Sequence, residues 1–277
     1  MRITHSLKKN LNIDNIIKTS FRQLGITMST VFMFFSDEIL EKFFSEIFVS
    51  VICLKILLAL LLFLIIFISH CFVSYKRKTV NISGYNYKIV VEYGNIFDFK
   101  DCKIVIPFDE FFTTKVGTAP SDIKRTSLCG QFLEKFPKVN INKIIESMGA
   151  YKPPSNEKNG LQSYKPGTLL LFENYLMMAF ARLDNEGRGV ITRDEYVECL
   201  MFMWREINKY YAQCDVCIPI LGSGITRLGD VSLSQQELLD IIICSYKLTA
   251  YKIKCPNKLH IVCVKKEDFS LNCIKEV

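Results

Sequence analysis

Hydrophobic and polar positions divide the chain into two parts with different patterns. Residues 56–75, ILLALLLFLIIFISHCFVSY, contain no Asp, Glu, Lys or Arg and show no polar stripe at helical spacing. From Lys78 onward, short apolar runs alternate with amphipathic ones. A run of about 20 apolar residues matches the length of a helix that crosses a bilayer core. The first pattern therefore predicts a membrane helix that begins near Phe48, and the second predicts strands alternating with helices.

The second part is predicted to be one mixed α/β domain of about 200 residues, which is within the ordinary size range of domains. Residues 151–166 are rich in Pro, Asn and Gly and predict an exposed loop. The predicted strands are 87–94, 102–108, 167–172, 175–182, 216–221 and 259–264, and the predicted helices are 127–136, 142–148, 193–211 and 235–251.

A weaker apolar stretch, residues 24–35, precedes the membrane helix and is short for a span. Residues 1–22 and 75–78 are basic, whereas residues 36–47 are acidic. Because basic segments stay on the cytoplasmic side, this pattern favours a two-pass hairpin with both termini in the cytoplasm. An interfacial amphipathic helix followed by a single span is the alternative. The predicted organisation is a basic cytoplasmic N-terminus at 1–23, a transmembrane region at 24–75 and an α/β domain at 76–277.

Charge and cysteine usage exclude several classes of function. The net charge of +7 arises partly from the basic groups that flank the membrane segment. No basic stripe is interleaved with aromatic residues, so nucleic acid is not an expected partner. The eleven cysteines are scattered and odd in number, which is typical of reduced cytosolic thiols. Cys214 and Cys217 form one CxxC pair, whereas a zinc ribbon needs two, and the three histidines are far apart, so no metal site is expected.

The stretch DVCIPILGSGITRLGD, residues 215–230, combines an apolar strand with a glycine turn. Gly222 and Gly224 can take positive φ and leave their backbone N–H groups uncovered. Ser223 and Thr226 add hydroxyl donors. The stretch is neither a Walker loop, because no Gly-Lys-Ser/Thr follows, nor a dinucleotide fingerprint.

A helix is predicted after this turn. Either of two capping boxes can begin it, Ser232 with Gln235 or Ser234 with Glu237. A strand, a glycine turn and a helix in this order form an anion site from backbone amides. A plain strand-to-helix turn without a ligand is the alternative reading.

Residues 184–195, DNEGRGVITRDE, partly match a calcium-binding EF-hand loop. Arg188 occupies a position where an oxygen ligand belongs, and the preceding segment predicts a strand where an EF-hand needs a helix. We therefore expect a structural turn in which Thr192 caps the next helix.

Three segments together resemble the macro-domain family: VVEYGNIFDF its first strand, CKIVIPFDEFFTTKVG its next strand and loop, and IPILGSGITRLGD its phosphate loop. The variant with Phe-Asp-Glu-Phe-Phe, Ser-Leu-Cys-Gly-Gln-Phe and a late Gly-Ser-Gly resembles the macro domain of Thoeris anti-phage effectors. In one branch of that family the macro domain follows an N-terminal membrane hairpin. The resemblance implies a macro-domain-like mixed α/β sheet flanked by helices, preceded by a transmembrane helical hairpin.

The same resemblance implies a cleft above the sheet that binds an ADP-ribose derivative. Asn95 falls where the family's acidic residue holds the adenine amino group, and an amide oxygen can accept that bond. The loop that wraps the diphosphate and ribose matches Gly222, Ser223, Gly224, Ile225 and Thr226. The other ligand-binding residues that it implies are Ile96, Phe108, Asp109, Ser127 and Gly130.

The resemblance further implies a membrane-anchored sensor at the inner membrane, with its macro domain in the cytoplasm. The signal would be an ADP-ribose derivative made by a partner TIR enzyme, such as ADP-ribose joined to histidine. Binding would oligomerise the chain, and the hairpins would breach the bilayer and kill the infected cell. The alternatives are a membrane-tethered ADP-ribosyl hydrolase and a constitutive scaffold without a ligand. The Asn-rich segment and the Gly-Gly-Gly run of the hydrolytic macro domains are missing, so we expect no catalytic residue and no cofactor.

Overall fold

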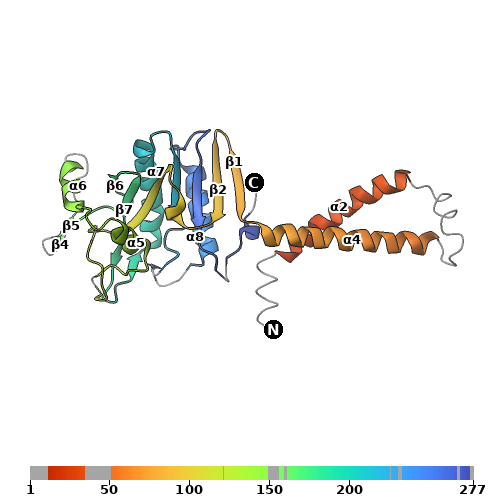
Figure 1. Ribbon diagram of the computed structural model, residues 1–277, viewed down its shortest axis with the longest axis horizontal. Helices are drawn as coiled ribbons and strands as arrows, with labels where there is room; N and C mark the ends of the chain where they lie inside the picture. The colour runs from red at the N-terminus through yellow and green to blue at the C-terminus, as the bar shows by residue number, and fades with distance from the viewer. Residues whose placement is uncertain are drawn as a thin grey trace. The chain divides into compact units, whose positions relative to one another are not determined.

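The computed structural model describes residues 12–34, 51–120, 122–148, 156–158, 161–224, 226–229, 233–266 and 269–274 (Figure 1). The chain divides into two compact units. One comprises Met1–Lys78 with Ser270–Lys275, and the other Thr79–Phe269 with Glu276–Val277. Residues 270–275, which the sequence pattern assigns to the α/β domain, thus cluster with the N-terminal helices.

The first unit contains two long helices, α2 (Ile13–Phe34) and α4 (Val51–Lys76). Within the described ranges one helix, over Lys55–Lys76, is long and apolar enough to cross a membrane, and none of this stretch is buried inside the protein. Helix α2 begins well before the apolar stretch that predicted it. The two helices contact each other through the rings of Phe21 and Phe63, with centroids 4.7 Å apart, and through Gln23 Oε1 and His70 Nε2, which lie 2.7 Å apart.

Helix α2 satisfies its own hydroxyl groups. Thr19, Thr27, Ser29 and Thr30 each donate a hydrogen bond to the carbonyl four residues earlier, at 2.8–3.0 Å. A hydroxyl bonded in this way is inexpensive to place in apolar surroundings. The polar residues that interrupt the apolar pattern of α2 therefore do not prevent it from lying against lipid.

The short helix η2 (Leu271–Cys273) also belongs to this unit. Asn272 accepts a hydrogen bond from Asn12 Nδ2 at its carbonyl oxygen, 3.1 Å away, and donates one from its own Nδ2 to the Ser74 carbonyl, 3.0 Å away. One side chain and its backbone thus join the start of α2 to the last turns of α4.

A mixed sheet forms the centre of the second unit, in the strand order β1-β2-β11-β9-β3-β7-β8-β10, with β6 paired to β7. The pairs β2–β11, β11–β9, β9–β3 and β3–β7 are parallel. The strands are β1 (Thr79–Gly84), β2 (Tyr87–Tyr93), β3 (Cys102–Asp109), β6 (Leu169–Phe172), β7 (Tyr175–Leu183), β8 (Gly189–Ile191), β9 (Asp215–Pro219), β10 (Arg227–Leu228) and β11 (Leu259–Cys263). Because five neighbouring strands run the same way, their carboxyl ends lie at one edge of the sheet, where open α/β sheets bind ligands.

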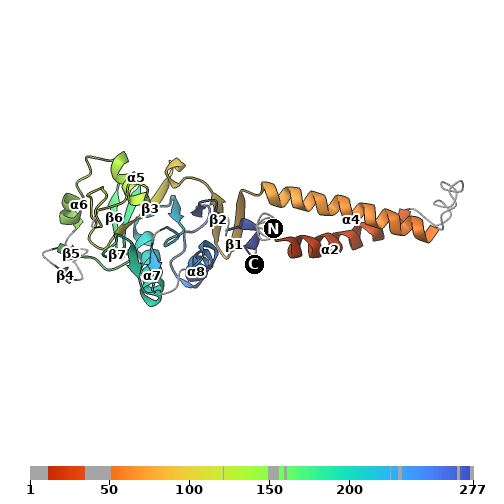
Figure 2. The ribbon, with the colours of Figure 1, turned by 90° about the horizontal axis from the view of Figure 1, so that it is seen from below.

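Helices cover both faces of this sheet (Figure 2). On one face, Phe132 of α5 (Leu128–Lys135) packs among Phe108, Phe136, Phe172 and Tyr175. On the other face lie α7 (Arg193–Tyr210) and α8 (Gln235–Leu248), which are joined by a buried hydrogen bond from the Trp204 indole to the Ser245 hydroxyl at 3.0 Å. The remaining elements are η1 (Ile96–Asp98), α6 (Ile141–Met148), β4 (Asn156–Lys158) and β5 (Leu161–Ser163).

Most predicted strands and helices of the α/β unit are confirmed, with two corrections. Helix α8 ends at Leu248 rather than at 251, because Thr249 is extended and its N–H bonds the Ser245 carbonyl. The segment predicted as an exposed loop at 151–166 includes the two short paired strands β4 and β5. Strands of three residues carry too few positions to show an alternating pattern.

Candidate functional site

Four segments that sequence separates widely leave the sheet at its carboxyl edge. Asn95 follows β2, Asp109 ends β3, the Gly222–Gly224 turn follows β9, and Lys266 follows β11. In the parallel register, Leu259 of β11 lies opposite Ile89 of β2 and opposite Val216 of β9. The segments that follow these three strands therefore leave the sheet side by side. The sequence prediction included the first three segments.

The glycine turn is anchored at its start. The carbonyl of Leu221 accepts a hydrogen bond from the buried Tyr196 hydroxyl of α7 at 3.0 Å. Gly222 has φ of +80°, and a Cβ there would lie 3.2 Å from the Leu228 side chain. The Ser223 N–H donates to the Ile220 carbonyl at 3.2 Å, which closes the turn. The positive φ thus favours glycine at 222, and a larger residue would also crowd the Leu228 side chain.

Gly224 differs from the expectation drawn from its sequence. It does not have positive φ, and a Cβ there would meet none of the described residues beyond its chain neighbours within 4 Å. Ile225 lies outside the described residues, and Thr226 packs toward Gly189 of β8. The space beside Gly224 is therefore open and is bounded by a turn that its neighbours hold in place.

The predicted order of strand, glycine turn and helix holds, but the helix is not adjacent to the turn. Helix α8 begins at Gln235, after β10. The Ser234–Glu237 capping box is confirmed, whereas Ser232 lies outside the described residues. An anion beside Gly224 would thus meet loop amides and not the first turn of α8.

Asn95 is exposed and caps the short helix η1. Its Oδ1 accepts a hydrogen bond from the Phe97 N–H at 3.1 Å, and a carbonyl oxygen has a second lone pair for another donor. The Ile96 side chain is buried in the core, so this residue could reach a ligand only through its backbone.

The Phe108 side chain also lies in the core, against Phe112 and Phe132, and is not available to a ligand. Asp109 is 5% exposed. Its two oxygens accept hydrogen bonds from the Thr113 N–H at 2.7 Å and the Thr113 hydroxyl at 2.6 Å. Burial raises the pKa of the Asp109 carboxyl above its usual value, and the bonds from Thr113 oppose part of that rise.

Ser127 and Gly130 have structural tasks at the start of α5. The Ser127 hydroxyl donates to the Lys124 carbonyl at 2.7 Å and accepts from the Gly130 N–H at 3.0 Å. A Cβ at Gly130 would lie 2.3 Å from the Lys124 carbonyl oxygen. Both residues therefore shape the segment beside Asp109, and the Ser127 hydroxyl is already engaged by the backbone.

A pocket of about 220 Å³ lies at the carboxyl ends of β3 and β7. Its walls include Glu110, which follows Asp109, and Val190 of β8, which pairs with Arg227 just after the glycine turn. Charged groups of both signs line it, including Arg182, whose Nη2 lies 2.9 Å from both carboxylate oxygens of Glu195. Sequence reasoning missed this pocket, because its walls come from four separated segments that share no motif.

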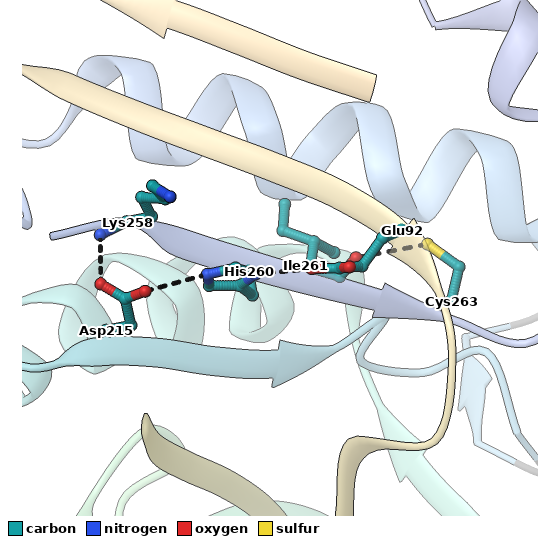
Figure 3. A network of polar contacts seen from close by, with 6 residues as sticks. All are labelled: Glu92, Asp215, Lys258, His260, Ile261 and Cys263. Carbon is teal, nitrogen blue, oxygen red and sulfur yellow. Dashed lines mark hydrogen bonds and ion pairs between the residues drawn. The ribbon is translucent and has the colours of Figure 1, made fainter. Parts of the chain in front are cut away.

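A polar network crosses three strands on the sheet (Figure 3). His260 Nδ1 lies 2.5 Å from Glu92 Oε1, and Nε2 lies 3.2 Å from Asp215 Oδ2. The other oxygen of Asp215 accepts from the Lys258 N–H at 2.9 Å. Asp215 is the first residue of β9 and His260 the second of β11, so these two lie toward the amino ends of their strands and away from the glycine turn, whereas Glu92 is the last but one residue of β2.

The thiols on these strands do not supply a nucleophile for His260. Burial raises the pKa of Cys102, Cys217 and Cys263. A thiol must lose its proton to attack or to bind a metal, and these thiols hold theirs more tightly than an exposed cysteine. No group of three His, Cys, Asp or Glu residues that could hold a metal ion occurs within the described part of the chain.

The turn over residues 184–195 has internal hydrogen bonds, and Thr192 caps the next helix as expected. Asp184 accepts from the N–H groups of Glu186 and Arg188 at 2.8 and 2.9 Å and from Arg188 Nε at 2.8 Å. Thr192 and Glu195 form a capping box at the start of α7. The oxygens that an EF-hand would offer to calcium are already bonded to protein donors.

Comparisons with known proteins give the family of this chain. The family model described as Thoeris protein ThsA, Macro domain, matches residues 89–264. The Thoeris protein ThsA of Bacillus amyloliquefaciens strain Y2 is 29% identical over 210 residues, which cover 71% of this chain and 68% of that protein.

Solved structures of macrodomains are also similar to this chain. The macrodomain of Thermus aquaticus DarG is 14% identical, covers 64% of this chain and 98% of its own, and has a TM-score of 0.39. The Oceanobacillus iheyensis macrodomain with ADP is 12% identical, covers 69% of this chain and 90% of its own, and has a TM-score of 0.44.

The buried Asp109 predicts a pH dependence of stability. Since its folded pKa is raised, its contribution to stability is fully present below the unfolded pKa, near pH 4, and is lost as pH rises through the folded pKa. Asp109→Asn keeps partners for both Thr113 groups and removes the titration. Relative to the unsubstituted chain, the variant should gain thermal stability as pH rises from about 4 to 8. Asp101→Asn, at an exposed position, is the control. A fall in the relative thermal stability of Asp109→Asn with rising pH would contradict this explanation.

The turn over 184–195 predicts the absence of tight calcium binding. Arg188 donates hydrogen bonds to both carboxylate oxygens of Asp184 and places a positive charge beside them. The Glu195 carboxylate already accepts hydrogen bonds from the Thr192 N–H and from Arg182. Calorimetric titration of the full chain should therefore show no binding at micromolar calcium. Micromolar affinity that disappears in Glu195→Gln would show that the loop rearranges to admit the ion.

Proposed function

The chain belongs to the Thoeris ThsA macro-domain family, and from this premise we propose that its α/β unit binds an ADP-ribose-derived signal nucleotide. Membership of this family fits a role in anti-phage defence and ligand sensing by the macro domain. The signal would come from a TIR enzyme, and its binding would drive the chain to oligomerise and disrupt the inner membrane.

The observation that carries the proposal is the open space beside Gly224. This space lies next to a turn fixed by Tyr196 and by the positive φ of Gly222, at the carboxyl edge of the parallel strands. A pre-formed turn with uncovered amides binds phosphate without first having to order the loop. The diphosphate of the signal would occupy the space, with the Gly224 amide among its donors.

The other segments at this edge can serve the two ends of such a ligand. The exposed Asn95 lies on the β2 side, where the second lone pair of Oδ1 is available to the adenine amino group. The pocket walled by Glu110 and Arg182 lies on the β3–β7–β8 side and offers charges of both signs. A signal such as histidine joined to ADP-ribose carries an ammonium and a carboxylate beyond its phosphates, which would match such a pocket.

The second candidate is a membrane-tethered ADP-ribosyl hydrolase. Family membership alone is compatible with binding or with hydrolysis. His260, with its two carboxylate neighbours, resembles a general base, but it lies toward the amino ends of β9 and β11 and next to thiols whose pKa burial raises. A sensor therefore accounts for the described residues better than an enzyme does.

The helical unit would carry out the effect. Helix α4 is an apolar segment of membrane-spanning length, and Asn272 joins its last turns to the start of α2. A ligand shifts the chain to an active arrangement only if it binds that arrangement more tightly than the resting one. Clustering of ligand-bound chains would gather these helices and perturb the bilayer.

Binding of ADP-ribose to the full chain in detergent tests the proposal, with Gly224→Val as the informative variant. Gly224 does not have positive φ, and a Cβ there meets none of the described residues beyond its chain neighbours, so the Gly224→Val variant should fold. The methyl groups of the valine would fill the phosphate space. Losing two or three hydrogen bonds to a charged group, at about 1.5–3 kcal/mol each, should weaken binding more than about a hundredfold.

Two other variants make this measurement selective. Gly222→Ala should lower both stability and affinity, because φ is +80° there and Leu228 is 3.2 Å away. Asn95→Ala should cost less affinity than Gly224→Val, because it touches only the base. A folded Gly224→Val chain with normal affinity would reduce the loop to a plain turn, and hydrolysis of the ligand at enzymatic rates would favour the second candidate.

The proposed hairpin predicts that both termini are cytoplasmic and that residues 36–47 are outside. Single cysteines at Ser36 and at Tyr85, which is 98% exposed at the β1–β2 turn, report the two sides in a chain whose eleven native cysteines are replaced. An impermeant thiol reagent on intact cells should label position 36 and not position 85, with the cysteine-free chain as the blank. Labelling at position 85 would show that the topology is the inverse of the one proposed. Protection at both positions would show that α2 stays on the cytoplasmic face of the membrane.

A further inference from the structure

Lys266 reaches the glycine turn from the neighbouring strand. Its Nζ lies 2.6 Å from the Ser223 carbonyl oxygen, and the ammonium donates to it. Strands β11 and β9 are parallel neighbours with Val262 opposite Pro219, so the segments that follow them leave the sheet side by side. The sequence gives no sign of this contact, because an exposed Lys-Lys pair after a strand is typical of a solvated surface.

A side-chain hydrogen bond anchors the backbone just before Lys266. Two residues earlier, the Val264 carbonyl accepts a hydrogen bond from Nε2 of the buried Gln235, the first residue of α8, at 3.0 Å. Among the described residues, no carboxylate pairs with Lys266. A long cationic side chain thus reaches a backbone carbonyl one residue from the open space at Gly224, and no acid among the described residues neutralises its charge.

We propose that Lys266 is a phosphate-binding residue of this site and that it selects ligands carrying a diphosphate. This inference rests on the proposed function, since it names a further residue of the same site. An ammonium has three donors, and the Ser223 carbonyl takes one, so the side chain can hold the turn and bond a phosphate oxygen together. A bond between two opposite charges is stronger than the neutral amide contacts of the turn.

This arrangement assigns different tasks to the groups around the phosphate. The turn gives shape, because its amides are neutral and fixed, whereas Lys266 gives the charge that separates a diphosphate from an uncharged nucleoside. Lysine acts here as a point charge and not as a planar fork, so arginine should replace it only partly.

The test is calorimetric titration of ADP-ribose into the full chain in detergent, at low and high salt. Lys266→Met keeps the apolar stem and removes the charge, and the neighbouring exposed Lys265→Met is the matched control for net charge. Lys266→Met should weaken binding by about tenfold or more, while Lys265→Met should change it less than about twofold. Lys266→Arg should recover part of the loss, and the salt dependence of binding should be smaller in Lys266→Met.

The outcomes separate this inference from the function beneath it. If the unsubstituted chain binds ADP-ribose and Lys266→Met binds it equally well, Lys266 is not a ligand residue and the proposed function stands. If both methionine variants lose affinity equally, the effect is one of net charge and the inference is again wrong. If the folded, unsubstituted chain binds no ADP-ribose, the proposed function falls and the inference falls with it.

Discussion

The candidate site depends on one constraint, the parallel hydrogen-bonded register of β2, β11, β9 and β3. It brings Asn95, Asp109, the Gly222–Gly224 turn and Lys266 to one edge from positions spread over more than half of the chain. A slip of one residue would turn every side chain of a strand to the opposite face. The packing of buried side chains on both faces therefore holds the register. The geometry of the edge is therefore a consequence of the core, and the loops inherit their positions from it.

Two polar contacts add to that apolar register. The Glu92–His260–Asp215 network links β2, β11 and β9 through side chains as well as through the backbone ladder, and each carboxylate has the imidazole as a partner. The Tyr196 hydroxyl fixes the Leu221 carbonyl, so helix α7 sets the start of the glycine turn. The Tyr196 contact is buried and the network is partly buried. A buried polar group carries a large penalty if it is left unpaired, which makes the Tyr196 contact specific as well as stabilising.

The sequence predicts the fold well where the hydrophobic pattern is long or strongly periodic. The strands around Ile89, Ile104, Leu176 and Ile261 and the helix of Tyr196 and Met203 are confirmed, because burial dictates their residues. Short strands such as β8 and β10 offer too few positions to reveal a period. The site is harder, because sequence shows which residues follow a strand but not where side chains point. Phe108 and Ile96 proved to belong to the core, while the contacts of His260 and Lys266 depend on strand neighbours far away in the chain. The difference between the two glycines of the turn has the same origin. Gly222 has positive φ and Gly224 does not, and the sequence pattern alone does not distinguish the two positions.

The route by which binding would influence the helices is narrow. Within the described residues, the chain crosses from one compact unit to the other after Lys78 and after Phe269. The second crossing lies between Lys266, which touches the glycine turn, and Asn272, which joins the start of α2 to the last turns of α4. Under the proposed function, a ligand affects the helices only through interactions that differ between the resting and active arrangements. Most contacts at the turn, such as the Leu221 carbonyl bond and the Gly222 packing, are fixed by the core and would be alike in both. Lys266 is exposed and bonded to a single carbonyl, so its partner can change at small cost, and it lies six residues from Asn272 in the sequence. A cation of this kind offers the differential contact that a fixed turn lacks.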